Sequence, residues 1–192
     1  MTDGQINAVV YSKNVIEFVT VANEYCKFIE SAGSEGVRTL LGKAQKLLPL
    51  LYLKISILPE FESQGELVLE KYVTEVEYHL LQQRIMNLLG AYDDYQEVFV
   101  PEMQFSDVPL AAGISENLTD IYQDLKDFIL SYRVGDDQVM HEALWTCMAN
   151  FRDYWGQKLV NGLRAIHSLL YSQTEFNQDM LPPEKAEGER FG

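Results

Sequence analysis

The stretch that decides the fold of this chain reads Asp153-Tyr-Trp-Gly-Gln-Lys-Leu-Val-Asn-Gly-Leu-Arg-Ala-Ile-His167. It lies inside a longer segment whose apolar residues recur every three or four positions, which is typical of one face of a helix. We expect this helix to start at Asp136 or Asp137 and to end near Tyr171, so that it would span roughly 50 Å at 1.5 Å per residue. Its apolar side consists of Leu144, Met148, Phe151, Trp155, Leu159, Gly162, Ile166 and Leu169.

Four segments upstream show the same period. We expect helices from Asn14 to Ser31, from Leu40 to Leu58, from Thr74 to Leu89 and from Ser115 to Tyr132. Pro49 predicts a kink or break in the second helix, because proline lacks a backbone donor and clashes with the preceding turn. Ser115 is the expected cap of the fourth helix. No segment alternates like a strand, so we expect an all-α, five-helix, mostly up-and-down bundle with a kinked second helix and a long C-terminal helix.

Two segments fall outside these helices. The connection from Ala91 to Gly113 has no helical period and is long for a compact domain, and such loops are often functional. Residues 173–192 contain Pro182-Pro183 and many charged side chains, so we expect a mostly disordered tail. Residues 1–172 are then expected to form a single helical domain.

The charge balance limits the possible partners. The chain has 29 Asp and Glu against 15 Lys and Arg, a net charge of -14. It would repel nucleic acids and anionic membranes, so we expect neither as a partner and favour another protein with a neutral or basic surface. No secretion signal is visible, and the most apolar run, Leu47 to Leu58, is too short to cross a bilayer. Cys26 and Cys147 are expected to be buried free thiols, which favours a cytoplasmic protein.

Polar side chains gather on two helix faces. Asp120, Asp124 and Asp127 share one face of the fourth helix, opposite its apolar residues, and we expect that face to be solvated. The last helix carries a second polar stripe, which consists of Thr146, Asn150, Asp153, Gln157, Asn161, Arg164 and Ser168. This stripe is expected to be exposed, but amides with an arginine suit a surface shared with a partner. Lys158 falls inside the apolar arc, so it must reach water or pair with a carboxylate.

No catalytic motif stands out. None of His79, His141 and His167 follows a glutamate by three residues, which excludes the usual di-iron site of ferritin-like bundles. No nucleophile triad has a supporting motif and no glycine-rich phosphate loop is present, so we expect no cofactor. One alternative stays open. Asp94-x-x-Glu97 and Asp124-x-x-Asp127 faintly resemble the acidic motifs with which all-helical nucleotide pyrophosphatases hold magnesium, and in that case the chain would be a metal-dependent hydrolase.

Several long runs of residues resemble a bacterial family of helical proteins known as a domain of unknown function, DUF5063. These runs are Leu47–Lys54, Tyr92-Asp93, Ser115-Glu116, Asp120–Phe128, Tyr132-Arg133 and Tyr154–His167. The resemblance spans most of the chain from Asn14 to Tyr171. It implies the fold and a bacterial origin, and it implies no reaction, ligand or catalytic residue.

The function that these observations favour is a helical protein-interaction or scaffold module without catalytic activity. We place its candidate site where the loop of residues 91–113 could fold over the fourth and fifth helices, and its residues are Asp93, Asp94, Tyr122, Gln157, Lys158, Asn161 and Arg164. A carboxylate of Asp93 or Asp94 is expected to lie against Lys158 or Arg164 and to form the floor of a small polar cleft. In the alternative interpretation this ion pair only holds the loop in place.

Overall fold

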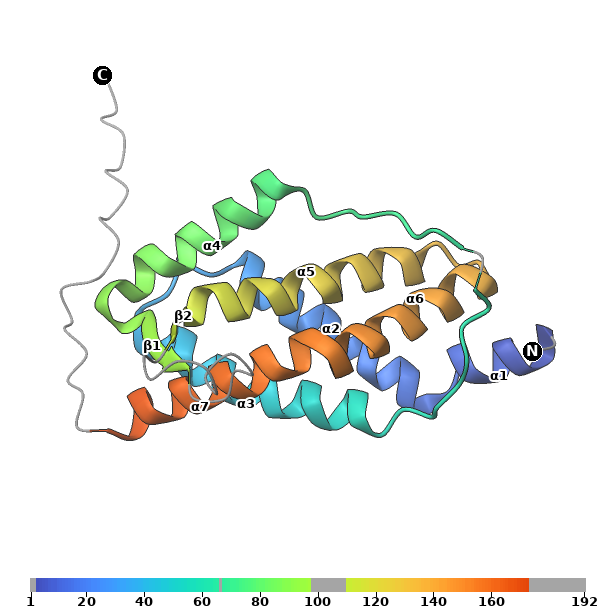
Figure 1. Cartoon of the computed structure of the whole chain (residues 1–192), viewed down its shortest axis with the longest axis horizontal. Coiled ribbons are helices and arrows are strands. Elements are labelled where there is room, and N and C mark those ends of the chain that lie inside the picture. Colours follow the sequence, from blue (N-terminus) through green and yellow to red (C-terminus); the bar gives the residue numbers. More distant parts are fainter. Residues whose placement is uncertain (1–2, 66, 98–109, 173–192) are drawn as a thin grey trace, which may run out of the picture.

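Helix α5 lies at the centre of the molecule, with the other principal helices packed around it along the long axis (Figure 1). The computed structural model describes residues 3–65, 67–97 and 110–172, so the predicted tail of residues 173–192 lies outside the described residues. The elements are α1 (Asp3–Val10), α2 (Lys13–Glu30), α3 (Val37–Ser56), α4 (Glu75–Leu89), a 3-10 turn (Gly90–Tyr92), β1 (Asp94–Glu97), β2 (Leu110–Gly113), α5 (Ile114–Arg133), α6 (Asp137–Asn150), a π-helical turn (Phe151–Trp155) and α7 (Gly156–Tyr171). The expected all-α bundle is confirmed, and its five helices correspond to α2, α3, α4, α5 and the continuous α6–α7.

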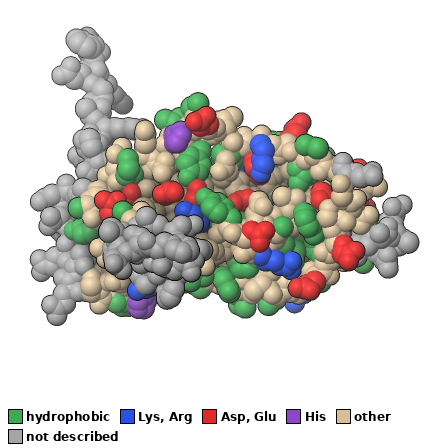
Figure 2. Space-filling view, in the orientation of Figure 1, with side chains coloured by type: hydrophobic (Ala, Val, Ile, Leu, Met, Phe, Trp, Pro, Cys, Tyr) green, Lys and Arg blue, Asp and Glu red, His purple; other side chains and the backbone are tan. Residues whose placement is uncertain are grey.

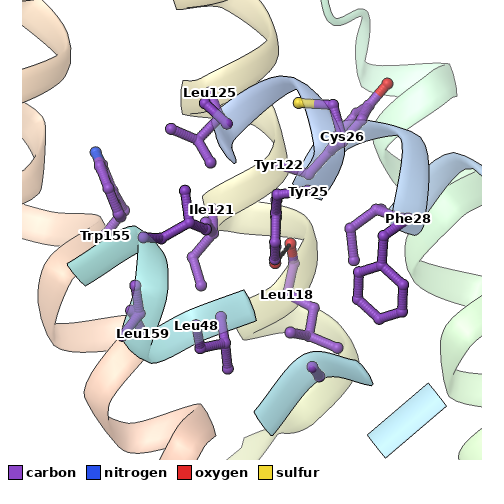
Figure 3. Close-up of a cluster of buried hydrophobic side chains, with 14 of the residues drawn as sticks. Tyr25, Cys26, Phe28, Leu48, Leu118, Ile121, Tyr122, Leu125, Trp155 and Leu159 are labelled. Atoms are coloured by element: carbon purple, nitrogen blue, oxygen red, sulfur yellow. Dashed lines mark hydrogen bonds between the residues drawn. The ribbon is translucent and has the colours of Figure 1, made fainter. Parts of the chain in front are cut away.

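The core forms where α2, α3, α5 and the last helix meet. Figure 3 shows side chains from these four elements converging on one apolar cluster. The buried side chains that meet there include Tyr25, Leu48, Leu118, Ile121, Leu125, Trp155 and Leu159. Removing each large apolar side chain from water contributes about 1.5–3 kcal/mol, so this cluster supplies much of the driving force for folding. The one polar atom that Tyr25 brings into it is satisfied, because its hydroxyl donates to the Leu118 carbonyl at 2.9 Å.

The structure differs from the sequence expectation in two places. Helix α1 was not expected, and it packs Ile6 and Val10 against Met140. The expectation that no strand forms was wrong, since β1 and β2 pair antiparallel with Asp94 opposite Gly113. Each strand has four residues, too few for alternation to be recognised against helical patterns. Of the kink or break expected at Pro49, the break does not occur, because α3 continues through that residue.

The last helix is interrupted by one wider turn. Residues Phe151–Trp155 form a π-helical turn between α6 and α7, and π turns inside helices are frequent at functional sites. Gly156 makes this turn possible, because a Cβ atom there would lie 2.3 Å from the Phe151 carbonyl oxygen. The start of the helix agrees with expectation, since the Asp136 carboxylate accepts hydrogen bonds from the amides of Gln138 and Val139, both at 3.0 Å.

An extended segment joins α3 to α4 across the outside of α5 and α6 (Figure 1). We call residues 59–65 and 67–73 the strap. Glu142 accepts hydrogen bonds from the Ser63 hydroxyl at 2.6 Å and from the Gln64 amide at 3.1 Å. At the other end Asp127 accepts from the amides of Tyr72 and Val73 at 2.8 and 3.0 Å. Two buried carboxylates therefore hold the strap by its backbone, where carboxylate–amide hydrogen bonds are stronger than neutral ones.

His141 beneath the strap gives the fold a sensitivity to acid. Its side chain is fully buried against the Phe61 ring, and neither ring nitrogen has a hydrogen-bond partner among the described residues. Burial lowers the pKa of His141, and the neighbouring Glu142 only partly opposes this. The unfolded chain therefore takes up a proton near the ordinary value of about 6.5 before the folded chain does, and stability falls as the pH drops through that value.

We predict that urea unfolding at pH 7.5 and pH 5.5 will show this loss in the unmodified protein. A His141→Met variant keeps a side chain of similar size without a titrating group. Its free energy of unfolding should fall less steeply over the same interval. Equal slopes in the two proteins would show that His141 does not carry the effect.

A polar seam with two clefts and an apolar groove

The carboxylates of α5 do not point to water. Asp120 and Asp127 are each 6% exposed, so the expected solvated face was wrong. The reason is that α4 and the strap cover the side of α5 that the apolar residues of α2 and α3 leave free. Three acidic residues of α5 instead contact polar side chains of α6, the π-helical turn and α7, and we call this contact the polar seam. Its members are Glu116, Asp120 and Asp124 of α5 with Asn150, Tyr154 and Lys158 of the last helix.

Asp120 is the centre of the seam. Its two oxygens accept hydrogen bonds from the Tyr78 hydroxyl at 2.6 Å and the Tyr154 hydroxyl at 2.7 Å. The Lys158 ammonium lies 3.5 Å from Asp120 Oδ2 and 3.6 Å from Glu116 Oε1. Burial and the bond to Asp120 raise the pKa of both tyrosines, so both stay protonated as donors. Lys158 pairs with a carboxylate, as its place in the apolar arc predicted.

The expected pairing of Asp93 or Asp94 with that lysine or with Arg164 was wrong. The Asp93 carboxylate accepts from the Ser115 amide at 2.7 Å and from the Ser115 hydroxyl at 2.6 Å, and only 4% of Asp93 is exposed. Asp94 is exposed, and no ion pair among the described residues links either aspartate to the last helix. The free amides at the start of α5 attract the carboxylate more directly than a distant cation does. Asp93, rather than Ser115, therefore caps α5.

The loop nevertheless reaches the last helix through β1. Tyr95 and Gln96 form a cleft with the C-terminal half of the polar stripe on the last helix, and we call it the ribbon cleft. Its remaining lining residues are Asn161, Arg164, Ala165 and Ser168, and its volume is about 200 Å³. Gln157 lies beside it and donates to Asn161 Oδ1 at 2.9 Å. A polar cleft with Asn161 and Arg164 was expected here, but Asp93, Asp94 and Lys158, which were expected to belong to it as well, do not line it.

Tyr122 belongs to a different surface. Its hydroxyl donates to Glu30 Oε1 at 3.1 Å, and Lys126 pairs with the same carboxylate. These contacts join α5 to α2, away from the stripe on the last helix. The structure therefore gathers Asn161 and Arg164 at one cleft and separates Tyr122 from them.

A second cleft lies under the strap, and we call it the strap cleft. Asp124 and Asp127 line it together with Asn150, which donates to Asp124 Oδ1 at 2.6 Å. Its volume is about 200 Å³, and its other lining residues are Leu69, Glu70, Lys71, Phe128, Ser131, Ala143, Thr146 and Cys147. Burial raises the pKa of Asp124, against the effects of Asn150 and Lys71.

The four carboxylates of the alternative metal site do not converge. Asp94 pairs with Gly113 just before α5, whereas Asp124 lies roughly 16 Å further along the helix axis at 1.5 Å per residue. Asp127 is held by the strap, and the side chain of Glu97 lies outside the described residues. In the described part of the chain, no three His, Cys, Asp or Glu side chains are arranged to hold a metal ion. The structure therefore does not support the hydrolase interpretation.

A third hollow is apolar and was not predicted. It lies between α3 and α7, has a volume of about 350 Å³, and we call it the apolar groove. Its lining residues are Pro49, Tyr52, Leu53, Ser56, Leu159, Val160 and Leu163. The sequence carried one signal for it. Within Leu47 to Leu58 most of the exposed positions are apolar as well, and 53% of Leu53 is exposed.

Comparisons with known proteins agree with the fold. The model of the family described as "Domain of unknown function (DUF5063)" matches residues 9–172. The crystal structure of protein BF1032 from Bacteroides fragilis is similar to this chain, with 44% sequence identity and a TM-score of 0.77 over 86% of this chain and 98% of that one. No curated protein matches significantly. Among the described helices none is long and apolar enough to span a membrane. The chain belongs to the DUF5063 family.

Proposed function

We propose that this protein is a cytoplasmic, non-catalytic interaction module that binds an apolar segment of another protein in the apolar groove. The observation that carries the proposal is the groove itself. It is walled by two adjacent helices, and Tyr52, Leu53 and Val160 at its edges are 43%, 53% and 44% exposed. Apolar side chains gathered around a hollow between helices are the usual features of a surface that receives an apolar helix or strand.

The polar seam supports a structural role beside this groove. Asp120 is already bonded to two hydroxyls and an ammonium, and Tyr78 and Tyr154 have a raised pKa, which makes them poor bases or nucleophiles. The two cysteines favour a non-catalytic protein in the cytoplasm. Burial raises the pKa of Cys26 to about 12, and both cysteines are free and buried, which suits a reducing compartment.

The charge of the protein favours a partner that is not acidic. The net charge is -14, so two acidic proteins would repel each other. On the face drawn in Figure 2 the described Lys and Arg side chains are separate and form no basic patch. We therefore propose a partner segment with apolar anchors and neutral or basic flanks, since its charge would assist the encounter while the groove supplies the affinity.

The proposal can be tested with a photo-crosslinking residue, p-benzoylphenylalanine, placed at Leu53 in cells that naturally contain the protein. We expect one discrete protein adduct, identified by mass spectrometry. Placing Val160→Asp in the same molecule should remove most of the adduct, because a buried charge opposite an apolar anchor weakens binding by about tenfold or more.

The matched control places the same residue at Val76 of α4, which is apolar, 68% exposed and on another helix. The adduct should be absent from that position. Equal adducts at Leu53 and Val76 would show nonspecific contact and would contradict the proposal. An adduct that consists of two copies of this chain would replace the proposed partner by self-association.

A further inference from the structure

The ribbon cleft lies between β1 and α7 (Figure 1) and shares no lining residue with the apolar groove. Asn161 in its wall is only 7% exposed, and the Gln157 amide fixes its orientation by donating to Oδ1 at 2.9 Å. In the opposite wall, the Tyr95 hydroxyl accepts a hydrogen bond from the buried amide of Asn117. Both walls are therefore held in place by hydrogen bonds, as is usual for a ligand site that is largely formed in advance.

Arg164 gives this cleft its charge. It is the only charged residue in the described lining, so no carboxylate there neutralises it. The chain has a net charge of -14, and each of the other arginines that the structure describes takes part in an interaction. Arg164 has no hydrogen bond or ion pair within the described ranges. An arginine without an acceptor, in a chain with so many carboxylates, points to an anion that the chain itself does not supply.

The lining favours a carboxylate over a phosphate. One guanidinium can bind a planar carboxylate through two parallel N–H···O bonds, so a single arginine is sufficient. Phosphate sites usually add the amides at a helix N-terminus, whereas the lining residues of α7 begin five residues after its start. The Ser168 hydroxyl and the Gln96 amide lie in the same lining and provide further neutral donors.

We propose that the ribbon cleft is a binding site for a small aliphatic monocarboxylate. The Arg164 guanidinium would donate to both carboxylate oxygens and the Ser168 hydroxyl to one of them. The alkyl part would lie against Ala165 and the Tyr95 ring. The cleft volume of about 200 Å³ is below the range of about 300–1,000 Å³ that is typical of drug-sized ligands, so it suits an acid of a few carbon atoms.

The binding test adds sodium butyrate to the whole chain at constant ionic strength and follows two-dimensional amide NMR spectra. We expect saturable shifts at Gln96, Ala165 and Ser168. Butyramide has the same size without the charge and should bind about tenfold more weakly or not at all, because it lacks the charge-assisted hydrogen bonds. Sodium phosphate at the same concentration should not produce these shifts.

Three arginine variants make the test specific. Arg164→Gln should weaken butyrate binding about tenfold. Arg152→Gln removes the same charge from another exposed arginine, whose partner Glu60 is itself 89% exposed, and should leave binding unchanged. Arg164→Lys keeps the charge but loses the two-bond geometry, so it should weaken binding several-fold. Since Arg164 is exposed, its two variants should melt at the temperature of the unmodified protein.

Several outcomes would overturn the proposal. Absence of saturable shifts, or equal binding of butyrate and butyramide, would show that the cleft does not recognise a carboxylate. The same shifts with phosphate would make it a site for anions in general. Equal effects of Arg164→Gln and Arg152→Gln would reflect only the loss of one positive charge. Shifts confined to Leu159 and Leu163 would place the alkyl chain in the apolar groove, whose own test by crosslinking is separate.

Discussion

Gly156→Ala is expected to be among the most damaging single substitutions in this protein, with a loss of about 3 kcal/mol or more in the free energy of unfolding. The new Cβ atom would lie 2.3 Å from the Phe151 carbonyl oxygen and 2.9 Å from two atoms of the Phe151 ring. A backbone oxygen cannot move aside as a flexible side chain can, so the π-helical turn would have to change. Differential scanning calorimetry should show a fall in Tm of roughly 6–12 °C, given about 2–4 °C per kcal/mol for a chain of this size.

Gly42→Ala in α3 is the matched control. No atom lies within 4 Å of a Cβ built at Gly42, and alanine is the better helix former. This variant should be neutral or more stable by about 0.5–1 kcal/mol. If both alanine variants melted at the temperature of the unmodified protein, the steric requirement at the π-helical turn would be refuted.

Asp120→Ala is the second substitution with a large expected effect, a loss of about 3 kcal/mol. It leaves the Tyr78 and Tyr154 hydroxyls without their acceptor, and it leaves the Lys158 ammonium with only Glu116 at 3.6 Å. Lys158 is about one-fifth exposed, so water relieves part of the cost, which is why the estimate stays at the low end for a buried ion pair. Urea unfolding is the appropriate measurement.

Asp120→Asn should lose less, about 1–2 kcal/mol, since its amide oxygen still accepts from one tyrosine. Asp153→Ala removes an exposed aspartate of the neighbouring turn and should change stability by no more than about 0.5 kcal/mol. The order of the three variants is the test. Equal losses for Asp120→Ala and Asp153→Ala would mean that the polar seam contributes nothing measurable.

The seam and the groove are related through α7. Lys158 and Val160 are two residues apart, so they project from nearly opposite sides of the helix. The rotation of α7 that brings Lys158 to Asp120 therefore also turns Val160 toward the apolar groove. We expect Asp120→Ala to weaken the proposed partner binding at the apolar groove and also to lower the free energy of unfolding, because both depend on the same rotation of α7.

Features that depend on the local order of residues along the chain could be predicted from the sequence. Helical period predicted α2, α3, α4, α5 and the last helix, because each helix must place one apolar stripe against the core. The helix starts at Thr74 and Asp136 could also be predicted, because a capping side chain bonds to amides only two or three residues further along the chain. The sequence also predicted that Lys158 must reach water or pair with a carboxylate, because its charge lies in an apolar arc, and the second alternative is the one that the structure shows.

Which side chains from different elements meet depends instead on the packing of the whole chain. Asp120 and Asp127 lie on the side of α5 opposite its apolar residues, and this position predicted that they face water. In the structure α4 and the strap cover that side of α5. The helical period of one segment carries no information about which other segment packs against it. The same limit applies to Asp93, whose partner at Ser115 follows from the antiparallel pairing of β1 with β2. The π-helical turn and the apolar groove also depend on how α7 lies against α3 and α5. Periodicity describes one helix at a time, and these sites form only between elements that lie far apart in the sequence.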